Sequence, residues 1–345
     1  MEADGVVRCL LTVLDTLSDI ARMMHPARLA GLVARLGDQD QLLRSTIASL
    51  SPQIETYEQI CLTSTLALQA CAGLRAAPDA GNPTLEAYRA MRQYHRAVEA
   101  LAALTETVPA VSRYLLEPRF RDDAVLARRL AEPAHSDSGV FHYENTTSQR
   151  GGFSALVPSW YDPNHPTPVV FALHGGSGHG RLFLWNWLPE VRSRGVIVVA
   201  PTATGSTWSL MEPEIDSGNL QAILTRVRAR WNVDPARIML GGMSDGGTFT
   251  LLSGLATDSP FSHLAPVAAS FHPMLLMMTD PERITGLPIH LTHGAQDWMF
   301  PVDGARTAFR MLHAAGAAIT YREIADLSHA YPRDGQGEVL DWFMG

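Results

Sequence analysis

Ser244 is the residue whose surroundings most strongly favour nucleophilic chemistry. It stands between Gly242 and Gly246 in the pattern G-x-S-x-G, directly after the apolar run 238–240. Glycines two residues either side of a serine permit a sharp turn between a strand and a helix, because backbone can pass close by without a Cβ clash. The N-terminus of that helix would direct unpaired N–H groups toward a developing oxyanion. A match to this five-residue pattern also occurs by chance in glycine-rich turns that have no chemical role. The pattern therefore indicates a nucleophile only if other loops supply a base and an acid for the serine.

Two later loops offer those partners. Asp297 follows the apolar run 288–292, and His329 follows the run 318–324. In this arrangement Asp297 orients the imidazole, while His329 takes the Ser244 proton and later protonates the leaving group. We expect activity to rise with pH as His329 loses its proton. No metal is needed for this chemistry.

Four other side chains compete for the two roles. Asp326 lies three residues before the histidine and would have to fold back onto the same loop. Asp303 begins a predicted helix, where a carboxylate is favoured by the helix dipole. His293 precedes the aspartate and is expected to hold its loop by a hydrogen bond. His272 ends a strand and could line the pocket, although a structural role is favoured.

A glycine-rich loop, HGGSG at residues 174–178, is the predicted oxyanion loop. Gly175 and Gly176 would bring backbone N–H groups close to a bound carbonyl. Gly176, or else Ser177, is expected to supply one donor, and the N–H of Asp245 the second. The loop lacks the spacing of a dinucleotide fingerprint, so no cofactor is expected.

Composition excludes several other classes of function. The net charge is −8, and neither half of the chain offers a basic face for nucleic acid. All 27 cationic residues are arginine. The absence of lysine from the sequence excludes Schiff-base lysine chemistry, a Ser-Lys dyad and a P-loop.

The sequence predicts a cytoplasmic protein without a membrane span. Its three cysteines, Cys9, Cys61 and Cys71, are odd in number and lack metal-like spacing, as expected of free thiols in a reducing compartment. The first residues lack the basic start of a signal peptide, and no apolar run approaches the length that we expect of a span.

The periodicity of the sequence divides the chain near residue 135. Residues 1–135 show helical apolar stripes, with helices expected near 7–24, 53–76 and 83–116, the last ended or kinked by Pro109. Residues 136–345 begin with an antiparallel strand pair and then alternate strands with helices. This pattern predicts an α/β fold with a mostly parallel sheet covered by helices on both faces.

Residues 138–345 resemble the α/β-hydrolase superfamily, particularly bacterial carboxylesterases of the phospholipase/carboxylesterase and predicted-esterase type. The resemblance rests on four motifs in the family's order: HGGSG at 174–178, GMSDG at 242–246, HGAQDWMFP at 293–301 and SHAYP at 328–332. It implies the hydrolase fold and the same catalytic triad. Small members commonly carry Gln or Ala after the nucleophile, where this chain has Asp245, and they usually lack a region like residues 1–135.

The resemblance and the motifs together predict a serine esterase that hydrolyses a neutral short-chain or aromatic ester. A thioesterase, peptidase or acyltransferase would use the same machinery, and a non-catalytic binding protein is the alternative from another class. Trp208 and Trp298 could wall the pocket. The methionine-rich segment 274–278 could form a lid, although ordinary packing is favoured.

The helical region has two predicted roles. It either packs near the strand ends of the hydrolase domain or forms a homodimer interface, because several apolar stripes need a partner surface. Packing of its helices against one another is an equally favoured alternative.

Overall fold

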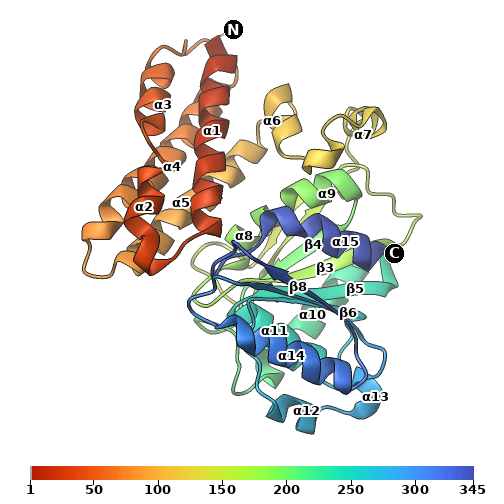
Figure 1. Cartoon of the computed structure of the whole chain (residues 1–345). Helices are drawn as coiled ribbons and strands as arrows, with labels where there is room; N and C mark the ends of the chain where they lie inside the picture. The colour runs from red at the N-terminus through yellow and green to blue at the C-terminus, as the bar shows by residue number, and fades with distance from the viewer. Residues whose placement is uncertain (1) are drawn as a thin grey trace. The chain divides into compact units, whose positions relative to one another are not determined.

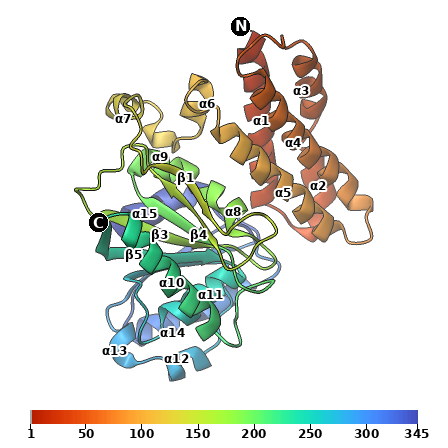
Figure 2. The same ribbon diagram turned by 180° about the vertical axis from the view of Figure 1, so that it is seen from behind.

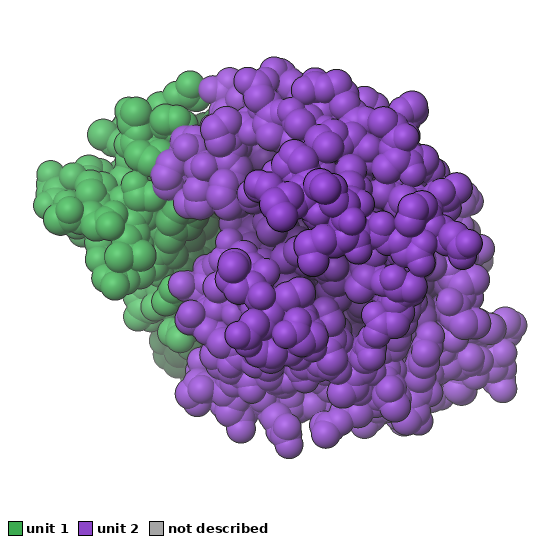
Figure 3. All heavy atoms as spheres, turned by 90° about the horizontal axis from the view of Figure 1, so that it is seen from below, with its two compact units in different colours: residues 1–121 green, residues 122–345 purple. Residues whose placement is uncertain are grey.

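The computed structural model describes residues 2–345, which form two compact units that divide between Arg121 and Asp122 (Figure 3). The sequence placed this division near residue 135. The difference comes from helix α7 (Ala124–Leu130), which belongs to the second unit. The guanidinium of its Arg129 lies 5.6 Å from the ring centroid of Trp160, a residue of that unit. The change in composition near residue 135 therefore marks the first strand and not the edge of a compact unit.

The first unit is entirely helical (Figures 1 and 2). Its helices are α1 (Glu2–Arg22), α2 (Leu29–Ala34), α3 (Gln39–Ala48), α4 (Tyr57–Ala76), α5 (Pro83–Ala102) and α6 (Pro109–Tyr114), with short 3₁₀ turns at Pro26–Arg28, Ala77–Asp79 and Pro118–Phe120. One face of α1 buries Leu10, Leu14 and Leu17 completely, as its apolar stripe predicts. The helix expected over 83–116 is in fact two helices. Pro109 begins the second one, a position where its missing N–H leaves no hydrogen bond unmade.

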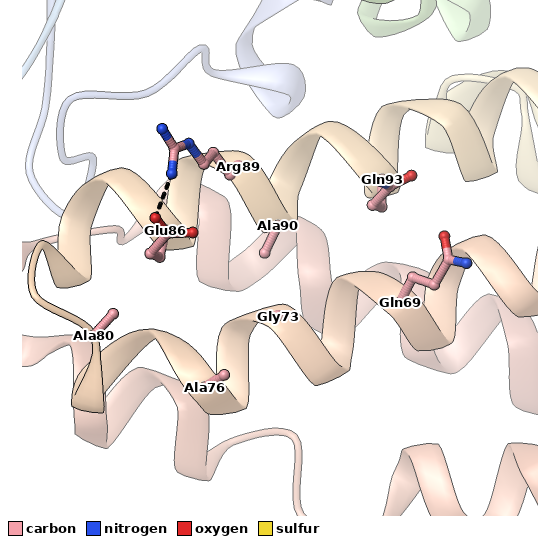
Figure 4. A pocket seen from close by; sticks show the side chains of 8 residues that line it. All are labelled: Gln69, Gly73, Ala76, Ala80, Glu86, Arg89, Ala90 and Gln93. Atoms are coloured by element: carbon pink, nitrogen blue, oxygen red, sulfur yellow. Dashed lines mark hydrogen bonds and ion pairs between the residues drawn. The ribbon is translucent and has the colours of Figure 1, made fainter.

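Helices α4 and α5 pack closely because small residues face one another. A Cβ on Gly73 would lie only 2.8 Å from the Cβ of Ala90. An open pocket of about 590 Å³ lies along this pair, and Figure 4 shows the Glu86–Arg89 ion pair at its side.

One helix of the described residues, Tyr57–Asp79, is long and apolar enough to cross a membrane by length and composition alone. This corrects the expectation that no apolar run approaches that length. Half of its 18-residue apolar window is buried, as in the core helix of a bundle. The absence of a membrane span stays a prediction.

The second unit is an eight-stranded, mostly parallel sheet with helices on both faces, as predicted. The strands are β1 (Gly139–Tyr143), β2 (Phe153–Val157), β3 (Thr167–Leu173), β4 (Ile197–Pro201), β5 (Val233–Met243), β6 (His263–Val267), β7 (Pro288–Gly294) and β8 (Ala318–Ile324). Their order is β1-β2-β4-β3-β5-β6-β7-β8. The pairs β1–β2 and β2–β4 are antiparallel, and all the others are parallel.

Helices cover the two faces of this sheet (Figures 1 and 2). Helices α9 (Leu188–Arg194) and α15 (Gln336–Met344) lie over one face, and α10 (Glu214–Arg230), α11 (Asp245–Gly254) and α14 (Val302–Ala314) over the other. The shorter segments are α8 (Gly180–Phe183), α12 (Met274–Met278), α13 (Pro281–Ile284) and 3₁₀ turns at Leu184–Trp187 and Arg333–Gly335. Parallel strands place the loops after β3, β5, β7 and β8 at one edge of the sheet, where ligands bind in such folds.

Candidate active site

Ser244 occupies a sharp turn between β5 and α11. Its backbone has φ 57° and ψ −120°, a conformation that costs free energy for any residue with a side chain. The neighbouring glycines explain why the chain can turn here. A Cβ on Gly242 would lie 2.6 Å from backbone atoms of Gly246, and a Cβ on Gly246 would lie 2.5 Å from the carbonyl oxygen of His174. The G-x-S-x-G spacing is therefore a requirement of close backbone packing.

The structure joins Ser244, His329 and Asp297 in one chain of hydrogen bonds. Ser244 Oγ lies 2.9 Å from Nε2 of His329, and Nδ1 of His329 lies 2.8 Å from Oδ2 of Asp297. The three residues are 7%, 4% and 8% exposed respectively. An ionised Asp297 accepts a hydrogen bond from the Nδ1–H group of His329, which leaves Nε2 unprotonated and able to take the proton of the serine hydroxyl.

Hydrogen bonds keep Asp297 ionised despite its burial. Burial opposes the charge, but the bonds from His329 and from the backbone N–H groups of Phe300 and Met299 outweigh it and lower the pKa of Asp297. The two N–H groups lie 2.8 and 2.9 Å from Oδ1. Both carboxylate oxygens are thus used, which fixes the side chain beside the imidazole.

The loop 174–178 lies against the serine. A Cβ on Gly175 would lie 3.5 Å from the Cβ of Ser244. No hydrogen bond within residues 2–345 uses the backbone N–H of Gly176, Ser177 or Asp245. As the first residue of α11, Asp245 has an N–H group without an intrahelical acceptor. Both segments that were predicted to form the oxyanion hole therefore carry unused donors, and which of them act stays a prediction.

Residues 205–342 match the model of the Phospholipase/Carboxylesterase family of hydrolases. The second unit has the α/β-hydrolase fold, and residues 205–342 within it are similar to this family. The match, the sheet order and the strand-turn-helix at Ser244 agree with the resemblance inferred from the sequence. Its bacterial character stays a prediction.

Curated relatives match only part of this chain. Acyl-protein thioesterase 1 of Gibberella zeae is 27% identical over 137 residues, 38% of this chain and 51% of that protein. Feruloyl esterase C of Emericella nidulans is 27% identical over 159 residues, 44% of this chain and 56% of that protein. The chain thus spans about half the length of these two relatives.

Solved structures are similar at a lower level. A thermostable esterase has a TM-score of 0.45 at 20% identity, covering 60% of this chain and 62% of its own. A fluorophosphonate-binding serine hydrolase of Staphylococcus aureus has a TM-score of 0.48 at 13% identity, covering 62% of this chain and 100% of its own. At this level of similarity neither structure indicates an activity for the hydrolase unit.

The competing residues of the hydrolase unit lie elsewhere or hold loops. His293 is fully buried, and its Nε2 lies 2.8 Å from the carbonyl oxygen of Phe300 and 3.4 Å from Oδ2 of Asp297. It therefore holds the loop of the aspartate, as expected, and burial lowers its pKa. Asp303 is exposed and pairs with an arginine of its own helix, and Asp326 is exposed. His272 is exposed, and its Nδ1 accepts the N–H of Met274.

Trp208 corrects one prediction. It is 2% exposed, its ring stacks on Phe249, and its Nε1 donates to the carbonyl oxygen of His174 at 2.7 Å. It supports the oxyanion loop through this hydrogen bond, and its burial leaves almost no surface for contact with a substrate. Trp298 is partly exposed beside Asp297, and its role in binding stays a prediction.

The structure also corrects the prediction that ordinary packing explains the methionine-rich segment 274–278. In α12, Met274, Met277 and Met278 are 58%, 85% and 82% exposed, so ordinary packing does not explain these three side chains. Leu275 and Leu276, between them, contact the core.

Sequence reasoning missed residues that hold the loops of the site. Arg150 donates to the carbonyl oxygens of Gly178, Ala203 and Ser206, and so ties the oxyanion loop to the loop after β4. Thr207 donates to the carboxylate of Asp245. Neither residue belongs to a motif, so no sequence signal identified it.

His174 fixes the oxyanion loop through its imidazole ring, which bonds to backbone groups on both sides. Its Nε2 accepts the N–H of Ala203 at 3.1 Å, so its Nδ1 carries the proton and donates to the carbonyl oxygen of Gly175 at 2.7 Å. Burial lowers the pKa of His174 to about 4. The imidazole is therefore neutral at pH 7.

Within residues 2–345, no group of three His, Cys, Asp or Glu side chains is placed to hold a metal ion.

Proposed function

We propose that the second unit is a serine esterase that hydrolyses neutral short-chain or aromatic carboxylic esters through an acyl-enzyme on Ser244. The observation that carries the proposal is the buried hydrogen-bonded chain from Ser244 through His329 to Asp297, set on a strained turn. Burying these polar groups is costly unless they are paired with one another, and a protein that only bound ligands would not need this arrangement.

In the proposed reaction the Ser244 oxygen attacks the ester carbonyl carbon while Nε2 of His329 takes its proton. Backbone N–H groups of Gly176 or Ser177 and of Asp245 stabilise the tetrahedral oxyanion. Collapse of this intermediate breaks the ester bond, and the imidazolium gives its proton to the departing alcohol. Water then attacks the acyl-enzyme by the same steps, and the acid leaves.

Charge near the serine supports a neutral acyl group. The Asp245 carboxylate directly follows the nucleophile and would repel a carboxylate or phosphate on the substrate. Relatives whose names are feruloyl esterase and acetylxylan esterase fit an aromatic or a short acyl group. A relative named acyl-protein thioesterase makes a thioester the second candidate substrate.

A substrate panel tests the proposal. Purified full-length protein would be given p-nitrophenyl esters of increasing acyl length, an aromatic methyl ester, acyl-CoA thioesters and amides. We expect the highest kcat/KM for a short or aromatic ester. A preference for the thioesters would favour the second candidate, and turnover of none of them would contradict a hydrolase.

The Ser244→Ala variant identifies the nucleophile within that panel. It should lower kcat by at least roughly 10³-fold, the loss expected for a member of such a triad. Ser253→Ala is the matched control, because Ser253 is a buried serine of helix α11, which follows Ser244, and its hydroxyl is bonded to Ser217. Near-wild-type turnover by the Ser244→Ala variant would exclude the assignment.

A further inference from the structure

Two loops of the site meet at the carboxylate of Asp245. Thr207 Oγ1 donates to Oδ2 of Asp245 at 2.6 Å, a short distance typical of a hydroxyl bonded to a charged oxygen. The same Oδ2 faces the oxyanion loop, because a Cβ on Gly176 would lie 2.7 Å from it. The side chain thus lies between the loop after β4 and the loop after β3.

The segment that carries Thr207 is held independently of this bond. Trp208 donates to the carbonyl oxygen of His174, and Arg150 donates to the carbonyl oxygens of Ala203 and Ser206. Loss of the Thr207 hydroxyl would therefore leave the loop in place.

The carboxylate is a competitor for the donors of the proposed oxyanion hole. The N–H groups of Gly176 and Ser177 are unused within residues 2–345, and a carboxylate oxygen is a stronger acceptor than an ester carbonyl. If its bond to Thr207 were absent, Asp245 could turn toward these donors. Its negative charge would then also lie closer to the developing oxyanion and oppose it.

We propose that Thr207 is a positioning residue, whose hydroxyl holds the Asp245 carboxylate away from the donors that stabilise the oxyanion. This inference rests on the proposed esterase function. The inference gives Asp245 two opposite effects on the reaction. Its backbone N–H stabilises the oxyanion, whereas its carboxylate would compete for the other donors unless Thr207 held it.

Thr207→Val tests the inference, because valine keeps the shape of threonine and lacks the hydroxyl. With a short p-nitrophenyl ester we expect kcat to fall about tenfold, the effect of one hydrogen bond to a charged group, with KM changed less than about twofold. Binding of a trifluoromethyl ketone, which forms an oxyanion on the serine, should weaken by a similar factor. Thr207→Ser should recover most of kcat, and Thr207→Ala is a second variant should valine disturb folding.

A second experiment asks whether the effect of Thr207→Val depends on the Asp245 carboxylate, as positioning requires, or reflects a general loss of loop structure. In an Asp245→Asn background, Thr207→Val should change kcat less than about twofold, because the neutral amide no longer competes as a charged acceptor. Thr225→Val is the matched control, since Thr225 is exposed on α10 and its hydroxyl is bonded only to its own helix, at Gln221. Circular dichroism and the temperature of unfolding would check that each variant is folded at the assay temperature.

The outcomes are distinguishable. If the wild-type protein and the Thr225→Val control hydrolyse the ester and Thr207→Val equals them, the inference fails and the proposed function stands. An equal loss in the Asp245→Asn background would also overturn it, because the effect would not pass through the carboxylate. Absence of ester hydrolysis in the wild-type protein would instead contradict the proposed function.

Discussion

The two units differ in what their buried polar side chains contact. In the helical unit, Asp40 and Glu117 are buried and each contacts an arginine, with Arg75 2.7 Å from Asp40 and Arg119 3.3 Å from Glu117. These pairs compensate a buried charge and join local segments. In the hydrolase unit, buried Ser244, His329 and Asp297 contact one another.

This difference separates buried polar side chains that only stabilise the fold from those that can take part in a reaction. In an arginine–carboxylate pair each charge is compensated by the other, and the arginine does not give up its proton. A hydroxyl, an imidazole and a carboxylate in series instead let the hydroxyl proton pass to the imidazole, which makes the serine oxygen a nucleophile. The histidines follow the same division. His25 and His95 of the helical unit bond to nearby backbone, whereas His329 bonds to two distant side chains.

The largest expected effect comes from breaking the proton path at its acid. Asp297→Asn keeps the shape but can hold the imidazole in the wrong tautomer, so kcat should fall by about 10⁴-fold. Asp326→Asn, at an exposed carboxylate three residues from His329, should cost far less. Steady-state kinetics on one ester would compare the two variants, and the reverse ranking would move the acid to Asp326.

The second expected effect is a loss of stability of the hydrolase unit in acid. The pKa of His174 is lowered to about 4, so between about pH 6.5 and pH 4 the unfolded imidazole is protonated and the folded one is not. Stability therefore falls as pH is lowered through this window, by about 3 kcal/mol in total from His174. Burial also lowers the pKa of His179, His263, His290 and His293, which adds in the same direction.

Tryptophan fluorescence can measure this loss in one unit alone, because all seven tryptophans lie within residues 122–345. Urea unfolding at pH 7 and pH 4.5 should show a lower midpoint at pH 4.5. An equal midpoint at both pH values would contradict the burial of neutral histidines in this unit.

The smallest expected effect is in the helical unit. Asp40→Asn removes the charge bonded to Arg75 and should destabilise the contact between α3 and α4 by about 1–2 kcal/mol. Hydrogen exchange of amides in these helices should become faster while ester turnover stays the same. Asp38→Asn is the control, because Asp38 is exposed and makes no side-chain cap to α3. A loss of turnover with Asp40→Asn would contradict the view that the ion pairs of the helical unit contribute to its stability and not to the reaction.

The sequence predicted the parts of the molecule whose structure depends on local backbone. Gly242 and Gly246 leave few alternatives to a close strand-turn-helix at Ser244, and apolar runs bounded by turns predicted the strands that carry Asp297 and His329. The order of these motifs along the chain then indicated one edge of one sheet.

Features that depend on contacts between distant segments were less predictable. The burial of Trp208 depends on His174 and Phe249, and the place of α7 depends on its contact with Trp160. The proposed role of the Thr207 hydroxyl depends on its hydrogen bond to Asp245, which is 38 residues away in the sequence. A homodimer through the N-terminal helices and a cytoplasmic location stay predictions, to be checked by light scattering and by fractionation.

The central claim is an acyl-enzyme on Ser244, and trapping it is the most direct test. The protein would be mixed with a p-nitrophenyl ester, quenched in acid within milliseconds and cleaved after arginine, which yields a peptide of residues 238–283 that contains Ser244. We predict that mass spectrometry finds this peptide heavier by one acyl group, with fragmentation placing the group on Ser244, and that the adduct is absent from the Ser244→Ala variant. Turnover of the ester with the acyl group on another residue, or an undiminished adduct in that variant, would contradict the account.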